Sequence, residues 1–90
     1  MRELIVSGPT EDPRVAEQAS EIRADAEGVR ERDLSVTERE AESFAVELRA
    51  DDGSVTARWE DTVGRQELWA RIDATPGRRR ELRERAAEAK

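Results

Sequence analysis

The sequence FAVELRADDGSVTARW at positions 44–59 carries the clearest structural pattern in the chain. Large apolar residues alternate with polar or small ones on both sides of Asp51-Asp52-Gly53, which has turn composition because glycine readily adopts a positive φ. Alternation with a period of two is typical of a strand with one buried face. The stretch therefore predicts a β-hairpin, in a sheet that is covered strongly on one side only.

The N-terminal third predicts a strand followed by a helix. Residues 4–6 are a continuous apolar run, which is typical of a central strand buried on both faces. Asp12 can cap a helix whose first position is Pro13, where a missing N–H has no cost. The helix is expected to run to about Arg32. Its apolar stripe would consist of Val15, Ala19, Ile22, Ala26 and Val29.

Further elements follow on both sides of the hairpin. Residues 34–37 alternate and predict a second strand, whereas the polar residues 38–43 predict a loop. A helix is expected to begin at Gly64, with Glu67 at the capping-box position. Residues 75–77 should interrupt it before a last helical stretch. The residues expected on the buried face of the helix that begins at Gly64 are Leu68, Trp69 and Ile72.

The predicted element order is β-α-β-β-β-α in one domain, residues 1–90, with residues 78–90 as a charged C-terminal helical tail. A right-handed crossover makes the first two strands parallel, and the hairpin must add beside them. This order excludes the ferredoxin-like arrangement, because three strands precede the second helix. It fits an α/β fold of minimal thioredoxin-like type. We expect a mixed four-stranded sheet with a central first strand and helices mainly on one face.

The composition restricts the chemistry. The chain has 22 acidic and 16 basic residues, a net charge of −6, and neither cysteine nor histidine. Thiol–disulfide exchange requires a thiolate, and a serine nucleophile requires a base such as histidine. A net negative charge also argues against nonspecific nucleic-acid binding. The acid-rich, lysine-poor composition indicates either a salt-tolerant source or a simple bias toward arginine.

Residues 44–53 and the sequence LWARIDATPGRRREL at positions 68–82 together resemble the bacterial domain-of-unknown-function family 4174. Its members typically have an apolar strand that ends in a charged-Asp-Gly turn, then a helix leading into Ile-Asp-x-Met-Pro-x-Arg-Arg-x-Glu. The resemblance implies a thioredoxin-like fold with no established activity. Thr75 stands where methionine is usual, and the segment between the second and third strands is short. We therefore expect one sheet face to be bare or used for association.

Two short motifs have both a functional and a structural interpretation. Ser7-Gly8-Pro9-Thr10 follows the first strand, where redox thioredoxins place Cys-Gly-Pro-Cys. It is interpreted as a structural turn, with a degenerate binding site as the alternative. The carboxylate pairs Glu11-Asp12 and Asp51-Asp52 lack calcium-loop spacing, so turns and caps are favoured over a metal site. No catalytic, cofactor-binding or metal-binding residue is assigned.

The C-terminal segment is the one local departure in charge. Residues 78–90 carry six basic and three acidic residues, a charge of +3 that leaves −9 elsewhere. The functional interpretation is a partner surface. The alternatives are a solvated helix with pairs such as Arg80–Glu84 and Glu81–Arg85, arginines that reach the acidic body of the domain, or a nucleic-acid contact. The residues of the predicted partner surface are Arg78, Arg79, Arg80 and Arg83.

The sequence thus favours a non-catalytic module that binds a protein partner or forms a homodimer. Alternatives are a small-ligand carrier or an enzyme that uses carboxylates and arginines, and weak nucleic-acid binding through the arginine-rich tail. Trp59 and Trp69 are expected in the core, with an exposed indole at an association surface as the alternative. Neither a signal peptide nor a membrane segment is evident, which predicts a cytoplasmic protein. Separately, no cofactor is expected.

Overall fold

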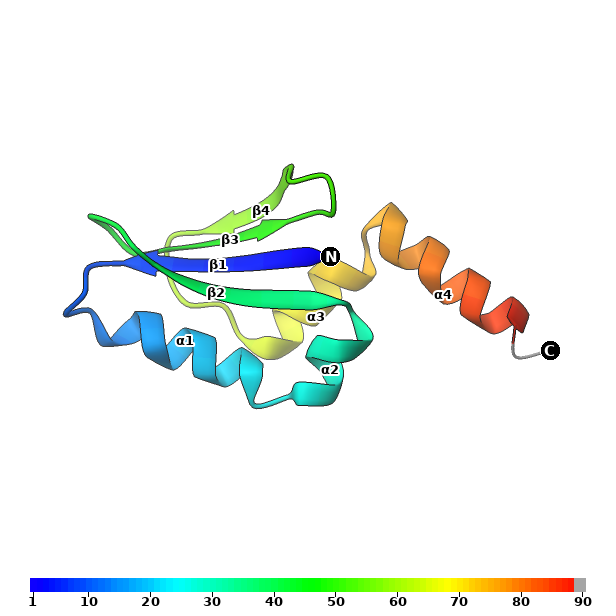
Figure 1. The fold of residues 1–90 in the computed structure, drawn as a ribbon, viewed down its shortest axis with the longest axis horizontal. Helices are drawn as coiled ribbons and strands as arrows, with labels where there is room; N and C mark the ends of the chain where they lie inside the picture. The colour runs from blue at the N-terminus through cyan, green and yellow to red at the C-terminus, as the bar shows by residue number, and fades with distance from the viewer. Residues whose placement is uncertain (89–90) are drawn as a thin grey trace.

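The computed structural model describes residues 1–88 and contains one mixed sheet with helices packed against it (Figure 1). The element order is β-α-α-β-β-β-α-α. The break between the last two helices was predicted at residues 75–77, whereas the division of the first helical unit was not. The elements are β1 (Arg2–Gly8), α1 (Pro13–Arg23), α2 (Ala26–Glu31), β2 (Leu34–Glu40), β3 (Ala45–Arg49), β4 (Val55–Trp59), α3 (Arg65–Asp73) and α4 (Pro76–Glu88).

The strand order is β2-β1-β3-β4, so the first strand is central, as predicted. β1 pairs in parallel with β2 and antiparallel with β3, and β4 pairs antiparallel with β3. Leu4 lies opposite Val36 on one side and Leu48 on the other, which brings three apolar side chains into one row. This arrangement confirms the α/β fold and the predicted mixed four-stranded sheet.

The hairpin between β3 and β4 is also confirmed. Gly53 has φ +86°, a conformation that side chains with a Cβ rarely adopt. Ala50 N–H donates to the Ser54 carbonyl at 2.9 Å, and the Ser54 hydroxyl donates to Asp52 Oδ1. The register shifts between Leu48 and Arg49, which marks a β-bulge.

The helix predicted from Pro13 to Arg32 is instead divided into α1 and α2. Asp12 caps α1 as expected, because its Oδ1 accepts from Arg14 N–H at 2.9 Å. Asp25 then ends the continuous helix, since its side chain accepts from Gly28 N–H at 3.1 Å and caps α2. A carboxylate that binds backbone N–H groups locally competes with the regular helical pattern. The prediction of one continuous helix was therefore wrong.

β2 extends to Glu40, so the prediction of a loop over residues 38–43 was wrong for its first three residues. β2 continues to Glu40 because it pairs with β1 along the full length of β1, and the last pair places Glu40 opposite Gly8. A polar sequence can continue an edge strand when backbone pairing is available on one side. Arg23 of α1 also supports this end of β2 by donating to Glu38 Oε2 at 2.8 Å.

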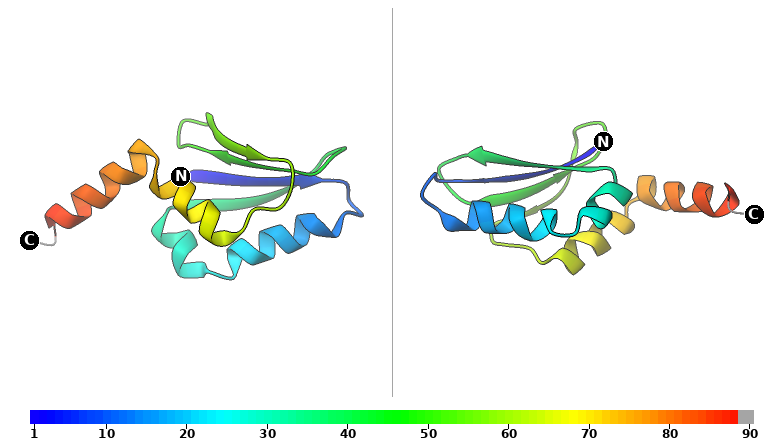
Figure 2. Two further views of the ribbon diagram at one scale, coloured as in Figure 1. Left: turned by 180° about the vertical axis from the view of Figure 1, so that it is seen from behind. Right: turned by 60° about the horizontal axis from the view of Figure 1, so that its bottom comes forward.

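The hydrophobic core lies between the sheet and the layer formed by α1, α2 and α3 (Figure 2). Burial of these side chains supplies the main favourable term in folding. Trp59 and Trp69 pack against the core but are only partly buried. The buried members of the cluster are Leu4, Val6, Ile22, Leu34, Phe44, Val46, Leu48, Val63, Leu68 and Ile72.

The opposite face of the sheet is polar, and none of the helices in residues 1–88 covers it (Figure 2). Ile5 lies at its centre with only 2% exposure, between Thr37 of β2 and Glu47 of β3. Thr37 donates its hydroxyl hydrogen to Glu3, and Arg49 forms an ion pair with Glu47 at 2.9 Å. The face is therefore bare of helices, and a polar network covers its central apolar residue, Ile5.

A buried glutamine joins α1 to the loop before α3. Gln18 Nε2 donates to the Val63 carbonyl at 3.0 Å, and Val63 N–H donates to Gln18 Oε1 at 2.7 Å. Both residues are buried. The side-chain amide thus satisfies two backbone groups of a loop that has no strand partner at this position.

We predict that Gln18→Met leaves both backbone groups of Val63 without a partner while nearly conserving the side-chain volume. Unsatisfied buried groups cost about 1–3 kcal/mol each, so the free energy of unfolding should fall by roughly 2 kcal/mol. Urea unfolding followed by tryptophan fluorescence measures this change. Gln66→Met is the control, because Gln66 is exposed on α3. Equal stabilities of the two variants would contradict the assignment.

Candidate functional site

Arg78 anchors the start of α4 to the body of the domain. Its side chain is only 2% exposed. Nε donates to Asp73 Oδ1 at 3.2 Å, and Nη1 donates to the Glu31 carbonyl at 3.2 Å and to Glu81 Oε1 at 3.4 Å. A guanidinium has five N–H donors in a planar fork, so it can bind several acceptors at once. Arg78 therefore connects α4 to both α2 and α3.

Two further arginines complete this ionic cluster. Arg2 of β1 is buried and donates to Glu81 Oε2 at 3.0 Å and to the Arg32 carbonyl at 2.6 Å. Arg32 donates from Nε and Nη2 to the two carboxylate oxygens of Asp73 at 3.2 and 3.0 Å. The cluster thus links β1, α2, α3 and α4. Its members are Arg2, Glu31, Arg32, Asp73, Arg78 and Glu81.

The prediction that Arg78 belongs to an exposed partner surface was therefore wrong. The sequence indicated an exposed arginine, but Arg78 points into the body because carboxylates of α2, α3 and its own helix converge there. The expected pairs Arg80–Glu84 and Glu81–Arg85 are not among the ion pairs of residues 1–88. Arg85 instead binds Glu31, while Glu81 binds Arg78 and Arg2. The structure thus agrees with one alternative from the sequence, in which arginines of the tail reach the acidic body of the domain: Arg78 and Arg85 do so.

α4 contacts the body through one face and otherwise projects beyond the end of the sheet (Figures 1 and 2). The anchoring residues Arg78, Glu81 and Arg85 follow a spacing of three and four, so they lie on one side of the helix. Leu82, the one leucine of α4, is 39% exposed. The face that α4 turns to the body is therefore ionic rather than apolar.

The neighbouring side of α4 carries two arginines beside a leucine. Arg79, Leu82, Arg83 and Ala86 follow the spacing i, i+3, i+4, i+7, which places them on one face, and all four are exposed. We call these four residues the α4 face. Arg80 is exposed as well but lies about 100° of helix rotation beyond Arg79, away from the anchored side. Within residues 1–88, no ion pair involves Arg79, Arg80 or Arg83.

Of the four predicted partner-surface residues, the structure thus brings Arg79 and Arg83 together. It places Arg80 on a different side of the helix and buries Arg78. Sequence reasoning missed Leu82 as an exposed member of the same face. The signal that could have revealed it is the spacing of the anchoring residues, since a helix attached through positions 78, 81 and 85 must expose the stripe beside them.

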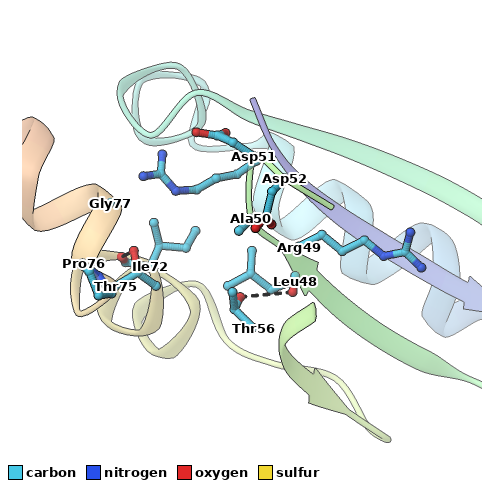
Figure 3. A pocket seen from close by; sticks show the side chains of 11 residues that line it. Leu48, Arg49, Ala50, Asp51, Asp52, Thr56, Ile72, Thr75, Pro76 and Gly77 are labelled. Carbon is cyan, nitrogen blue, oxygen red and sulfur yellow. Dashed lines mark hydrogen bonds between the residues drawn. The ribbon is translucent and has the colours of Figure 1, made fainter. Parts of the chain in front are cut away.

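A pocket of about 330 Å³ lies beside the root of α4, between the hairpin and the α3–α4 junction (Figure 3). Leu48 and Ile72 form its apolar floor, and Pro76 belongs to its α4 side. Thr56 donates its hydroxyl hydrogen to the Leu48 carbonyl, and Thr75 to the Ile72 carbonyl. The volume is at the lower limit of known ligand sites. The polar side chains that line the pocket already form hydrogen bonds or ion pairs with other groups of the domain.

The two motifs with alternative interpretations have structural partners. In the turn after β1, a Cβ added at Gly8 would lie 2.8 Å from Val15, which explains the glycine by close packing. Asp12 caps α1, and its hydrogen bonds from Arg14 lower the pKa of its carboxyl group. Asp51 accepts from the N-terminal ammonium group at 2.7 Å, which lowers the pKa of Asp51. No group of three or more potential metal ligands comes together in the described part of the chain.

Both tryptophans use their indole N–H groups within the domain. Trp69 Nε1 donates to Asp25 Oδ2 at 3.0 Å, and the Arg32 guanidinium lies 4.5 Å from the ring centroid. The hydrogen bonds from Gly28 and Trp69 lower the pKa of Asp25. Trp59 Nε1 donates to Glu67 Oε2 at 2.8 Å. The indoles are thus partly buried, each held by a carboxylate.

Comparison with known proteins yields no relative. No family model matches the chain, and no curated protein or solved structure matches it. The resemblance to family 4174 therefore stays a prediction. Among residues 1–88, no helix has the length and apolar character needed to cross a membrane.

We predict that Arg78→Met destabilises the domain, because it leaves Asp73 and the Glu31 carbonyl without a central donor. Removing one partner of a buried ion pair costs about 3–5 kcal/mol, and the partial exposure of the carboxylates reduces this to roughly 2 kcal/mol. Urea unfolding measures the change. Arg79→Met is the matched control on the adjacent, exposed position. A control variant that loses as much stability as Arg78→Met would refute the anchoring role.

The cluster also predicts a pH dependence of stability. Burial raises the pKa of Asp73, but hydrogen bonds from Arg32 and Arg78 outweigh it and bring the pKa below the ordinary 3.8. A lowered pKa in the folded state stabilises the protein above the unfolded pKa, and this contribution is lost as the pH falls through the folded value. Asp73→Asn should therefore be less stable than the native chain near pH 6.

The difference between Asp73→Asn and the native chain should shrink as the pH falls below about 4 and through the lowered pKa of the folded Asp73 carboxyl group, because the protonated carboxyl also lacks the charge. Urea midpoints measured between about pH 6 and 2 test this. Glu42→Gln serves as control, because Glu42 is exposed and outside the cluster. A pH-independent gap between Asp73→Asn and the native chain would show that the charge of Asp73 does not act as described.

Proposed function

We propose that this chain is a non-catalytic thioredoxin-like module that binds a protein partner through the α4 face. The observation that carries the proposal is the attachment of α4. One side of the helix is held by the ionic cluster, while the adjacent side presents Arg79 and Arg83 beside the exposed Leu82. A helix fixed in orientation in this way presents its free face in a defined position, which reduces the entropy lost on binding.

The energetics of α4 support a partner. The helix has 13 residues, a length at which isolated helices are marginal in water. Among residues 1–88, Arg85 is the most C-terminal residue of α4 that forms an ion pair with the body of the domain. A partner that covers Leu82 and Ala86 would bury apolar surface that the domain itself leaves in water. Arginine is also enriched at protein interfaces, where it combines charge with a flat contact area.

The charge of the α4 face defines the chemistry of the partner. Arg79 and Arg83 are four residues apart and therefore lie about 6 Å apart along the helix. A partner surface with two carboxylates at matching spacing, beside small apolar residues, would complement both the arginines and the leucine. We therefore propose a helix with an acidic and partly apolar exposed face as the binding element of the partner.

The absence of a catalytic role is part of the proposal. It is supported by the composition, since the chain has neither histidine nor cysteine to act as base, nucleophile or thiolate. The carboxylates Asp12, Asp51 and Asp73 are each engaged by a cation of the domain itself. These groups therefore have structural partners rather than a free cleft to act in.

A labelled synthetic helical peptide with glutamates at i and i+4 beside alanines tests the proposal. We expect fluorescence anisotropy to show binding that is weakened at least tenfold, that is by about 1.4 kcal/mol, in Arg79→Glu/Arg83→Glu. Leu82→Asp should weaken it as well. Arg30→Glu/Arg39→Glu changes the net charge equally at exposed sites outside α4 and should bind normally. Equal affinities of all variants would contradict the proposal.

A further inference from the structure

The outward side of α1 has the properties that the α4 face requires. Gln18, Ala19 and Ile22 form the buried stripe of α1, so the opposite side of the helix faces solvent. That side presents small residues beside two glutamates four positions apart. No ion pair within residues 1–88 uses either glutamate. The exposed residues on this side, here named the α1 face, are Ala16, Glu17, Ser20 and Glu21.

The two faces match in charge, spacing and size. Glu17 and Glu21 have the same i, i+4 spacing as Arg79 and Arg83, so two helices packed along each other can align both pairs. Leu82 projects beside the two arginines, on the flank nearer the anchored side of the helix. Small side chains on a facing helix leave the groove into which such a residue packs. The same chain thus carries an exposed basic helix face and an exposed acidic one of complementary shape.

The two faces of one molecule do not meet. α4 projects beyond the end of the sheet where β1 begins, whereas α1 lies beneath the sheet and starts at its opposite end, with α2 between α1 and α4 (Figures 1 and 2). The ionic cluster around Arg78 fixes this direction, because it holds α4 against α2 and α3. Contact between the α1 and α4 faces is therefore available only between separate molecules.

We propose that the partner of the α4 face is a second copy of this chain, which offers its α1 face. This inference rests on the proposed function, since it names the occupant of the same surface. In a twofold pair each molecule contributes both faces, so the α1–α4 contact forms twice. The four arginine–glutamate pairs are exposed at the rim and are screened by salt. The association is consequently weak and decreases with ionic strength.

Sedimentation equilibrium of the full chain over a concentration series tests the proposal. The native chain should approach twice the monomer mass at low salt and dissociate as salt is added. Arg79→Glu/Arg83→Glu and Glu17→Arg/Glu21→Arg should each raise the dimer dissociation constant at least tenfold, because reversal opposes like charges. Arg30→Glu/Arg39→Glu, equal in charge change to the first variant, should still dimerise.

Mixing the two interface variants gives the decisive result. One then has two acidic faces and the other two basic faces, so an equimolar mixture should form a 1:1 heterodimer although each variant alone is monomeric. Restored association in the mixture also shows that both variants are folded. A mixture that stays monomeric, or a native chain that is monomeric at every concentration, would overturn the second copy as occupant.

The peptide experiment separates this inference from the function on which it rests. If the native chain is monomeric yet binds the acidic helical peptide through Arg79 and Arg83, the second copy is refuted and a foreign acidic helix takes its place. If neither association occurs, both proposals fail. If the chain dimerises but the charge-reversal variants do so equally well, a different surface is responsible and the proposed pairing of α1 and α4 is refuted.

Discussion

The burial of the Arg78 guanidinium among three carboxylates is the interaction on which the arrangement of the C-terminal half depends. A buried cation is tolerated only when its donors find acceptors, and Asp73, Glu31 and Glu81 provide them from three helices. Because a guanidinium is planar, these acceptors fix its orientation and with it the axis of α4. Arg2 shares Glu81 and thereby ties the same cluster to the central strand. The exposed face of α4 is thus a consequence of where its charged side chains are satisfied.

Regular alternation and turn chemistry made the sheet predictable from the sequence. The hairpin needs Gly53 at positive φ, and the central position of β1 follows from its uninterrupted apolar run together with a right-handed crossover. The break between α1 and α2 was not visible, because Asp25 can either continue a helix or cap a new one. Only the position of Gly28 N–H and of Trp69 decides between these roles. The polar end of β2 likewise depends on its pairing partner and not on its own composition.

The candidate site was predictable in part, and the difference lies in the reach of arginine. The run from Arg78 to Arg83 indicated a basic surface, and Arg79 and Arg83 do lie together on an exposed face. Whether an arginine points to solvent or into the body depends on carboxylates that are distant in sequence, such as Glu31, 47 residues from Arg78. Arginine side chains also pack against aromatic rings in this chain, which has few large apolar residues. Guanidinium groups lie over the rings of Phe44 and Trp69 at 4.4 and 4.5 Å from their centroids.

The β-bulge at Leu48 and Arg49 affects the outer margin of the sheet. β4 is an edge strand, and an edge with regularly spaced, unpaired N–H and C=O groups can recruit a strand from another molecule and start fibre growth. A bulge twists the neighbouring strands and disturbs this spacing. β2, at the other margin, ends in the charged residues Glu38, Arg39 and Glu40, which repel a second copy of the same strand. Both margins therefore disfavour cross-β stacking, so the sheet can keep one face bare of helices without becoming a template for aggregation.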